Sequence, residues 1–259
     1  MSSAAKILTE NYLSAATADQ INERQMATTR IVFLGMLFVS FLIISNLTAF
    51  KVVEIHLTHT FSINFPAALV FFPLTYFFDD VLTEVYGFKM SRLVIWGGLI
   101  CSAMITLCTW IAVQLPASSI WDANTNHGAS AYALVFKGSL RIFIASMLAY
   151  FCGEFLNSML LAKLKVMTAG KYFSLRVMAS TAVGVGIDSM IFCNIAFWNV
   201  MPQHIIWEII VTLYLFKVSY EFMMLPITYT LTSYLKKKDH IDFYDTHTKF
   251  NPFSLNLTD

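Results

Sequence analysis

Seven ionisable side chains lie inside long apolar stretches of the sequence. They are Asp79, Asp80, Glu84, Glu154, Asp188, Lys217 and Glu221. A charged side chain at the centre of a bilayer costs roughly 2.5–3.5 kcal/mol on insertion scales, so these residues are expected to face a polar interior. Six of the seven are acids. The surplus carboxylates must be protonated, reach water or bind a donor-rich or cationic ligand, which favours a transport pathway over a scaffold with a polar interior.

The spacing of these residues places several of them on shared helix faces. Three pairs are three or four residues apart, namely Asp80 with Glu84, Glu154 with Asn157, and Lys217 with Glu221. Asp188 and Lys217 both fall near the middle of their apolar stretches. One structural alternative stays open. In it, Lys217 pairs with Glu221, and Asp80 or Asp188 is held by Arg92, by Arg176 or by a neighbouring Ser or Thr purely for packing.

The composition indicates the solvent in which these helices must lie. The 259 residues are 57% apolar and only 13% charged, about half the charge of an ordinary soluble protein. The number of apolar segments that are long enough to cross a bilayer predicts an all-α membrane protein with six transmembrane helices. They are Ile31–Phe50, Phe61–Tyr86, Leu93–Leu115, Ile142–Leu164, Val177–Val200 and Ile205–Leu235. Pro66 and Pro73 should kink the second span, and Pro226 the sixth.

The basic residues predict the orientation of the chain. Thirteen of the 17 Lys and Arg lie on the side that carries both termini, three lie on the other side, and Lys217 lies within a span. Both termini are therefore expected in the cytoplasm of a multi-pass protein. Residues 1–30 form a cytoplasmic tail or a short interfacial helix, residues 31–235 the transmembrane domain, and residues 236–259 a second cytoplasmic tail. Ser180 and Gly184 should let a neighbouring helix approach closely.

Other classes of function find little support. The six His lie outside the spans or at their ends, and no H-E-x-x-H, Walker A or G-x-S-x-G motif occurs. Gly184–Asp188 resembles the Gly-x-Gly-Asp of intramembrane aspartyl proteases but has one extra residue before the Asp. The four Cys lie within spans and behave as small hydrophobic residues. No catalytic residue, metal or cofactor is expected, and a net charge of +1 gives no basic field for nucleic acid.

Four groups of polar residues together resemble one bacterial family. They are DVLTEVYG at residues 80–87 with Ser91, Arg92 and Trp96; GEFLNS at 153–158 with AKLK at 162–165; Arg176, Ser180, Thr181, Gly184 and Asp188; and KVSYE at 217–221 with Pro226. Their order and spacing over residues 31–236 are similar to those of the bacterial queuosine precursor transporters, which belong to the vitamin uptake transporter group.

The resemblance implies a six-helix importer of 7-cyano- or 7-aminomethyl-7-deazaguanine in the inner membrane, supplying the modified tRNA nucleoside queuosine. It also implies a fold like the substrate-binding subunits of energy-coupling-factor transporters. A deazaguanine is flat and presents adjacent N–H donors, which a carboxylate accepts in pairs. We expect substrate-binding roles for eight residues. Glu154 or Asp188 would bind the donor edge, Asn46 and Asn157 the remaining polar groups, Tyr150 or Tyr220 would stack, and Lys217 would hold Glu221 ionised.

The energy source leaves two alternatives. The chain acts alone as a secondary transporter, with Asp80, Glu84 and Arg92 in proton coupling or gating, or it is the substrate-binding subunit of an ATP-driven vitamin or nucleobase transporter. Energy-coupling-factor subunits present Ala-x-x-x-Ala on their first span, and here Gly35–Val39 offers half of that pattern. Action as a single chain is therefore favoured. An intramembrane enzyme is the remaining alternative, and a homodimer is left open.

Overall fold

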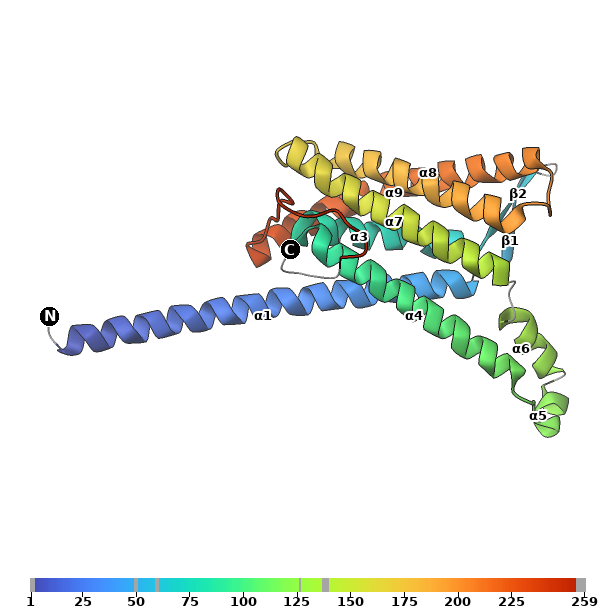
Figure 1. The fold of residues 1–259 in the computed structure, drawn as a ribbon, viewed down its shortest axis with the longest axis horizontal. Coiled ribbons are helices and arrows are strands. Elements are labelled where there is room, and N and C mark those ends of the chain that lie inside the picture. The colour runs from blue at the N-terminus through green and yellow to red at the C-terminus, as the bar shows by residue number, and fades with distance from the viewer. Residues whose placement is uncertain (1–2, 49–50, 59–60, 126, 137–139, 255–259) are drawn as a thin grey trace.

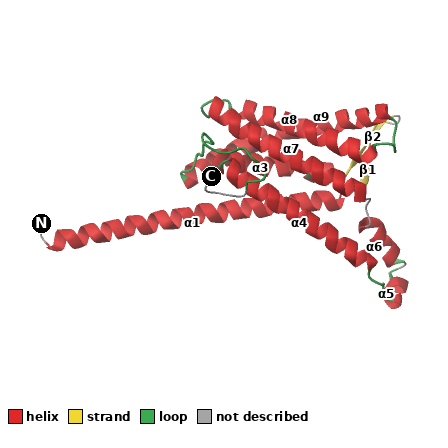
Figure 2. Ribbon diagram, in the orientation of Figure 1, coloured by secondary structure: helices red, strands yellow, loops and turns green. Residues whose placement is uncertain are grey.

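The computed structural model describes residues 3–48, 51–58, 61–125, 127–136 and 140–254. Nine helices and one two-stranded hairpin are present in these ranges, as Figure 1 and Figure 2 show. The elements are α1 (Ser3–Thr48), β1 (Val52–Thr58), β2 (Phe61–Pro66), α2 (Ala68–Phe71), α3 (Pro73–Tyr86), α4 (Phe88–Gln114), α5 (Ser119–Asn124), α6 (Gly128–Phe136), α7 (Leu140–Met167), α8 (Phe173–Phe197) and α9 (Gln203–Asp239).

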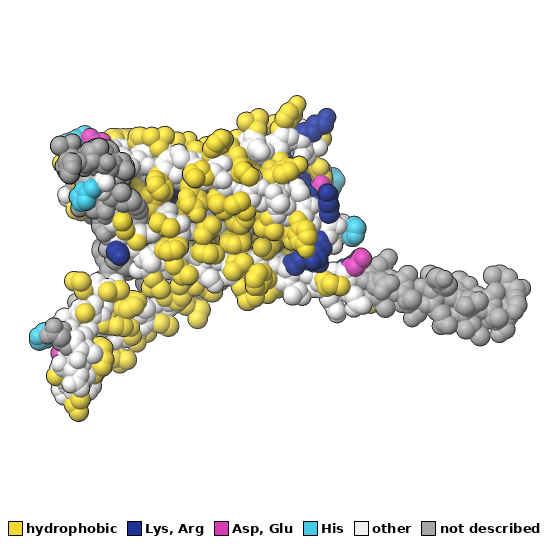
Figure 3. Space-filling view, turned by 180° about the vertical axis from the view of Figure 1, so that it is seen from behind, with side chains coloured by type: hydrophobic (Ala, Val, Ile, Leu, Met, Phe, Trp, Pro, Cys, Tyr) yellow, Lys and Arg dark blue, Asp and Glu magenta, His cyan; other side chains and the backbone are white. Residues whose placement is uncertain are grey.

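Within the described ranges, five helices are long and apolar enough to cross a membrane. They are the segment Ile21–Thr48 of α1, α4, the segment Phe143–Met167 of α7, α8 and α9. Their outer surfaces carry exposed Leu, Ile, Met and Trp side chains, and Figure 3 shows a broad apolar face with Lys and Arg gathered at one end. A chain with several such helices is a multi-pass membrane protein.

The second span differs most from its prediction. Instead of one helix over Phe61–Tyr86, the structure has strand β2, the short helix α2 and then α3. Pro66 ends β2, and Pro73 occupies the first turn of α3, where its missing N–H costs nothing. β2 pairs antiparallel with β1, with Val53 opposite Phe65 and Ile55 opposite Ile63. The apolar run was long enough for a span, but its first part satisfies its backbone groups in a hairpin.

The polar residues are positioned by α3, which is the central helix of the bundle. All of its residues except Leu74 are buried, and α1, α4, α7 and α9 surround it. Apolar side chains such as Phe38 of α1, Val81 of α3 and Ile95 of α4 form the core on one side of α3. The other side of α3 faces α7, α8 and α9 and carries acids.

Two glycines allow α7 and α8 to pack closely. A Cβ placed on Gly153 would lie 2.8 Å from Cβ of Asp188, and one placed on Gly184 would lie 2.9 Å from Cβ of Asn157. Both distances are too short for any larger residue without a shift of one helix. The prediction that Ser180 and Gly184 admit a neighbouring helix is therefore confirmed, and the helix is α7.

Two helices differ from their expected ends. α1 begins at Ser3 and runs without a break into the first predicted span, so the polar N-terminal stretch is helical and projects beyond the bundle in Figure 1. α9 continues through Pro226 to Asp239 and ends at His240, which has a left-handed backbone with φ of 52°.

Beyond α9 the chain forms an extended segment, residues 240–254, which we call the C-terminal strap. It lies across the ends of α3, α4 and α7, on the side from which α1 projects (Figure 1). It is hydrogen-bonded to the end of α3 and to the start of α4. Phe243 N–H donates to Val85 C=O at 3.2 Å, and the Phe88 N–H donates to Asp245 at 3.0 Å.

Candidate functional site

A group of buried polar side chains fills the space between α3, α7, α8 and α9, and we call it the central polar cluster. It comprises Tyr76, Asp80, Glu154, Asn157, Asp188, Lys217 and Glu221, none of which is more than 8% exposed. The structure thus brings together five of the eight residues predicted to bind substrate, namely Glu154, Asn157, Asp188, Lys217 and Glu221.

Asp80 is held by neutral groups. The Asn157 amide donates to one carboxylate oxygen at 2.8 Å, and the Thr181 hydroxyl donates weakly to the other at 3.5 Å. Of the partners expected for Asp80 in the structural alternative, a neighbouring Thr is present as Thr181. Arg92 and Arg176 are not its partners, because both guanidinium groups lie at the end of the bundle near the C-terminal strap. Asp80 therefore has no full positive charge against it among its hydrogen-bond partners.

Asp188 and Lys217 form a buried ion pair between α8 and α9. The ammonium group also lies 4.5 Å from the ring centroid of Phe72, which adds a cation–π contact. The predicted pairing of Lys217 with Glu221 is therefore wrong. The Lys217 side chain points across to α8 rather than along its own helix, and the partner that it neutralises is Asp188.

Asp79 and Glu154 are hydrogen-bonded to hydroxyl groups. Asp79 is bonded by Ser91 of α4 and Ser158 of α7, and Ser91 and Ser158 also contact one another at 2.8 Å. The Thr75 hydroxyl lies 3.1 Å from one oxygen of Glu154 and 2.7 Å from Phe72 C=O, so its single hydrogen is shared between these two acceptors. These hydroxyls had no predicted role. Thr75 lies one turn before Asp79 and Ser158 one turn after Glu154, so shared helix faces would have indicated them.

Several polar atoms of the central polar cluster have no hydrogen-bond partner among the residues that the structure describes. They are the Tyr76 hydroxyl, Oε2 of Glu154, Oδ1 of Asn157 and both carboxyl oxygens of Glu221. A buried polar atom left unsatisfied costs about 1–3 kcal/mol. Apart from the hydroxyl, these atoms are acceptors. The arrangement is therefore suited to a ligand that offers hydrogen-bond donors.

A second polar group, the Glu84 network, lies between the central polar cluster and the C-terminal strap. Arg176 binds Glu84 through two hydrogen bonds of 2.6 and 3.0 Å, Lys236 binds it at 2.6 Å, and Lys165 lies 3.8 Å away. Lys165 and Lys236 in turn bind Asp242 of the strap. Three cations thus stabilise the ionised form of Glu84.

Two of these cations also affect the ionisation of Asp242, the strap carboxylate. Partial burial of Asp242 opposes its ionisation, but hydrogen bonds from Lys165 and Lys236 outweigh this effect and lower the pKa of Asp242. Arg92, predicted to act in coupling or gating, donates to the Asn251 C=O of the strap at 2.9 Å. Arg92 therefore fastens the strap and lies outside the central polar cluster.

The other three predicted binding residues contribute no unsatisfied buried polar atom among the described residues. Asn46 accepts a hydrogen bond of 3.2 Å from Ser146, and the Tyr150 hydroxyl donates to Ile95 C=O at 3.0 Å. Tyr220 is half-buried and, as the neighbour of Glu221, points to a different side of α9. The aromatic rings beside the free acceptors are Tyr76 and Phe72, whose centroids are 5.8 Å apart.

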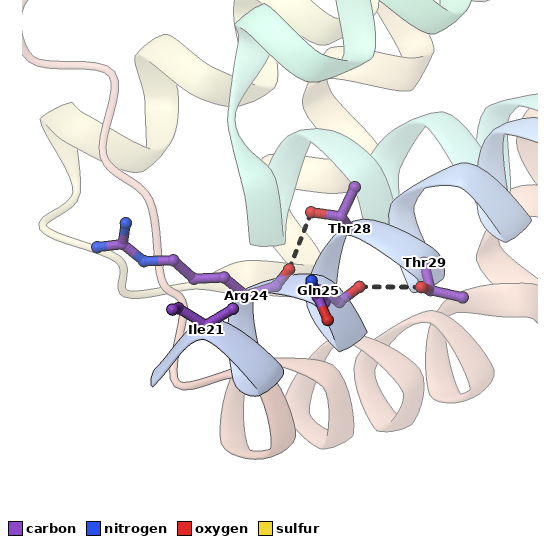
Figure 4. Close-up of a pocket in the computed structure, with 5 residues that line it drawn as sticks. All are labelled: Ile21, Arg24, Gln25, Thr28 and Thr29. Atoms are coloured by element: carbon purple, nitrogen blue, oxygen red, sulfur yellow. Dashed lines mark hydrogen bonds between the residues drawn. The ribbon is translucent and has the colours of Figure 1, made fainter. Parts of the chain in front are cut away.

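A groove on the outer surface of α1 is a weaker candidate (Figure 4). Ile21, Arg24, Gln25, Thr28 and Thr29 line it, and all five are exposed. The two hydroxyls donate to Arg24 and Gln25 carbonyls one turn earlier, as Ser and Thr commonly do in helices. The groove holds no buried polar atom that calls for a ligand.

Comparison with known proteins assigns the chain to a family of transporters. Residues 66–231 match the family described as "Putative vitamin uptake transporter", and this match covers more than half of the chain. The chain belongs to this family. It is also 26% identical over 186 residues to the "Probable queuosine precursor transporter" of Bacillus subtilis (strain 168), covering 71% of this chain and 77% of that protein. No solved structure matches significantly. The matched region of the transporter family begins at the end of β2 and contains every residue of the central polar cluster.

Proposed function

We propose that this chain imports a 7-deazaguanine precursor of queuosine, in the 7-cyano or the 7-aminomethyl form, across the bacterial inner membrane. The observation that carries the proposal is the set of unsatisfied buried acceptors on Glu154, Asn157 and Glu221. The guanine-like edge of such a base offers adjacent N–H donors, and an aminomethyl group adds a cation. Membership of the transporter family and the name of the Bacillus relative support this substrate class.

The geometry suggests how the base would be held. Glu154 Oε2 and Asn157 Oδ1 accept from the donor edge, while the base packs against one of the rings of Tyr76 and Phe72, which lie edge-to-face at 67°. Glu221, also unpaired, accepts from the substituent at the far side of the base. The Asp188–Lys217 pair closes the site on the side of α8 and α9. With α2 and α3 together as the sixth crossing beside the five long helices, both termini would lie in the cytoplasm and this site within the membrane.

The decisive test is salvage in cells that cannot make the precursor. Glu154→Gln and Asp188→Asn should each reduce queuosine in tRNA more than tenfold at limiting precursor. Glu208→Gln, at an exposed position of α9, is the matched control and should leave the level unchanged. Normal queuosine in both variants would refute the assignment. A thermal-shift screen of the purified chain with purines, deazapurines and pteridines should show stabilisation by the deazaguanines, whereas a scaffold would respond to none.

The chain is proposed to act alone. The small residue Gly35 of α1 is turned toward α4, since a Cβ there would lie 3.2 Å from Val94. It is therefore used within the bundle and does not offer a docking surface to an ATP-driven module. Collapse of the proton gradient should abolish uptake in energised vesicles. Uptake that survives this treatment but stops on ATP depletion would favour the subunit of an energy-coupling-factor transporter.

A further inference from the structure

The number of protons available to Asp79, Ser91 and Ser158 is smaller than the number of contacts that they make. The three side chains form a closed ring of oxygen–oxygen contacts, Asp79 to Ser91, Ser91 to Ser158 and Ser158 to Asp79. All three residues are fully buried. Each contact at hydrogen-bonding distance needs one hydrogen between its oxygens. The two serine hydroxyls supply two hydrogens, and an ionised carboxylate supplies none.

We propose that Asp79 carries a proton in this conformation and is the proton-binding residue that couples import to the proton gradient. The carboxyl O–H supplies the third hydrogen and closes the ring. This inference rests on the proposed function for its coupling role, whereas the protonation itself follows from the contacts. It moves the coupling role from Asp80 and Glu84 to Asp79.

Burial has the largest effect on Asp79 and opposes its ionisation, and hydrogen bonds from Ser158, Ser91 and Asn157 offset part of this effect. The titratable groups that interact with Asp79 are Asp80 and Tyr76 on its own helix and Glu154 and Tyr150 on α7. None of these is a cation, so an ionised Asp79 would meet only like charge or neutral groups. The cations of the neighbouring helices bind other partners: Arg92 of α4 the strap, Arg176 of α8 Glu84, and Lys217 of α9 Asp188. On the α1 side, Phe41 packs against Phe78.

A row of polar contacts between α3 and α7, which we call the polar seam, places Asp79 between the proposed substrate site and the Glu84 network. Its contacts follow the two chains in the same order, Thr75 with Glu154, Asp79 with Ser158, and Glu84 C=O with Lys165. Glu154, whose second oxygen has no partner among the described residues, therefore lies one turn from Asp79 on the side of the proposed substrate site. The seam leads in the other direction to the Glu84 network.

Loss of this proton has a mechanical consequence. The carboxyl O–H bond breaks, a water molecule that enters from the side of the Glu84 network accepts the proton, and Asp79 keeps the electron pair as a carboxylate that accepts from both serines. No hydrogen then remains between Ser91 and Ser158, so their oxygens repel and move apart. Because Ser91 belongs to α4 and Ser158 to α7, deprotonation loosens the contact between these two helices. The protonation state of Asp79 thereby acts on helix packing.

The first test is infrared spectroscopy of the full chain in liposomes. At neutral pH the wild type should show the C=O stretch of a protonated buried carboxyl, and Asp79→Asn should abolish that component. Asp80→Asn, the adjacent and equally buried position, should retain it. Ser91→Ala should shift the component to higher wavenumber, because the carboxyl loses one hydrogen bond. Ser91→Ala provides the test of the proton assignment if Asp79→Asn does not fold. A spectrum unchanged by both variants would overturn the proton assignment.

The second test separates binding from coupling. Asn has the donors and the acceptor of a neutral Asp, so Asp79→Asn should keep exchange of labelled deazaguanine within about twofold of wild type. It should lower gradient-driven accumulation at least tenfold and remove its sensitivity to a protonophore. Wild-type accumulation by this variant would overturn the coupling role. If the wild type transports no deazaguanine at all, the proposed function fails, and the infrared result still decides whether Asp79 is protonated.

Discussion

In the Asp188–Lys217 pair, each buried charge is compensated by the opposite charge of its partner. Both side chains are nearly inaccessible, and Lys217 also packs on the Phe72 ring. Removal of one partner from such a pair leaves an uncompensated charge, whereas removal of both restores neutrality. The pair therefore behaves as one unit in any mutational experiment.

Lys217→Met should lower the free energy of unfolding by about 3–5 kcal/mol, the usual cost of breaking a buried ion pair. The double variant Lys217→Met with Asp188→Asn should recover most of that loss. Both values are measured by thermal unfolding of the purified protein in detergent. Equal destabilisation in the single and the double variant would show that the two side chains do not depend on each other.

Glu84 has a different role from the other acids, since three cations surround it. Glu84→Gln should cost about 3 kcal/mol or more, because it leaves Arg176 buried without its carboxylate. Deazaguanine affinity should change less than twofold, because Glu84 lies outside the central polar cluster. Thermal unfolding and equilibrium binding measure the two effects. Glu23→Gln, at an exposed site of α1, is the control for general charge effects. A large loss of affinity without a loss of stability would place Glu84 in the substrate site.

At the scale of helices, the sequence alone predicts the spans that are continuous. α4, α7, α8 and α9 follow the predicted spans, with ends displaced by a few residues, because long apolar runs leave no other way to satisfy the backbone in lipid. The second span was wrong because its apolar residues are equally suited to a strand and a short buried helix. Hydrophobic periodicity and amino-acid composition do not distinguish a membrane-spanning helix from a strand followed by a short buried helix.

Candidate residues were predictable by type, and their partners were not. Acids within apolar runs pointed correctly to the interior, but helix faces alone do not determine which of two neighbouring helices a long side chain reaches. Lys217 illustrates this limit, since it binds across to α8. The position of the strap could not be predicted from the sequence either, because its contacts join residues that are far apart in the chain. Arg92 and Asn251, for example, are 159 positions apart.

The turn between α3 and α4 has a glycine, Gly87, at the position where Phe243 of the strap packs against it. Gly87 has φ of 89°, and a Cβ there would lie 2.3 Å from Cδ1 of Phe243. Gly87→Ala should therefore destabilise the protein by more than about 1 kcal/mol through backbone strain and displacement of Phe243. Gly97→Ala is the matched control, since a Cβ at that helical position meets nothing within 4 Å and should be neutral or slightly stabilising. Thermal unfolding compares the two, and an equal shift in both would contradict this account.

For the molecule as a whole, charge is concentrated in the interior and at the ends, and the lateral surface is apolar. The strap closes the interior at one end by covering the Glu84 network. Its attachment depends on Asp242, whose pKa is lowered in the folded protein. Because the folded value lies below the unfolded one, Asp242 stabilises the docked strap at pH values above about 4. That contribution is lost as the pH falls through the folded pKa.

Hydrogen exchange measures this directly. The Phe243 amide, bonded to Val85 C=O, should be protected at pH 7 and lose part of its protection, corrected for intrinsic rate, below about pH 4. Asp242→Asn should show the reduced protection already at pH 7, and its protection should vary less with pH. The effect is expected to be modest, because the Asp242 side chain is 43% exposed. Protection that is independent of pH in the wild type would exclude Asp242 as the anchor.

The place of the strap in chain order matters for biogenesis. Every helix of the bundle precedes residues 240–254, so each is synthesised before the segment that covers Glu84, Arg92 and Lys165. Until then these buried charges must be satisfied by cytoplasmic water or by the insertion machinery. An assembly intermediate with an open, hydrated end is therefore built into the order of synthesis, and its closing coincides with completion of the strap.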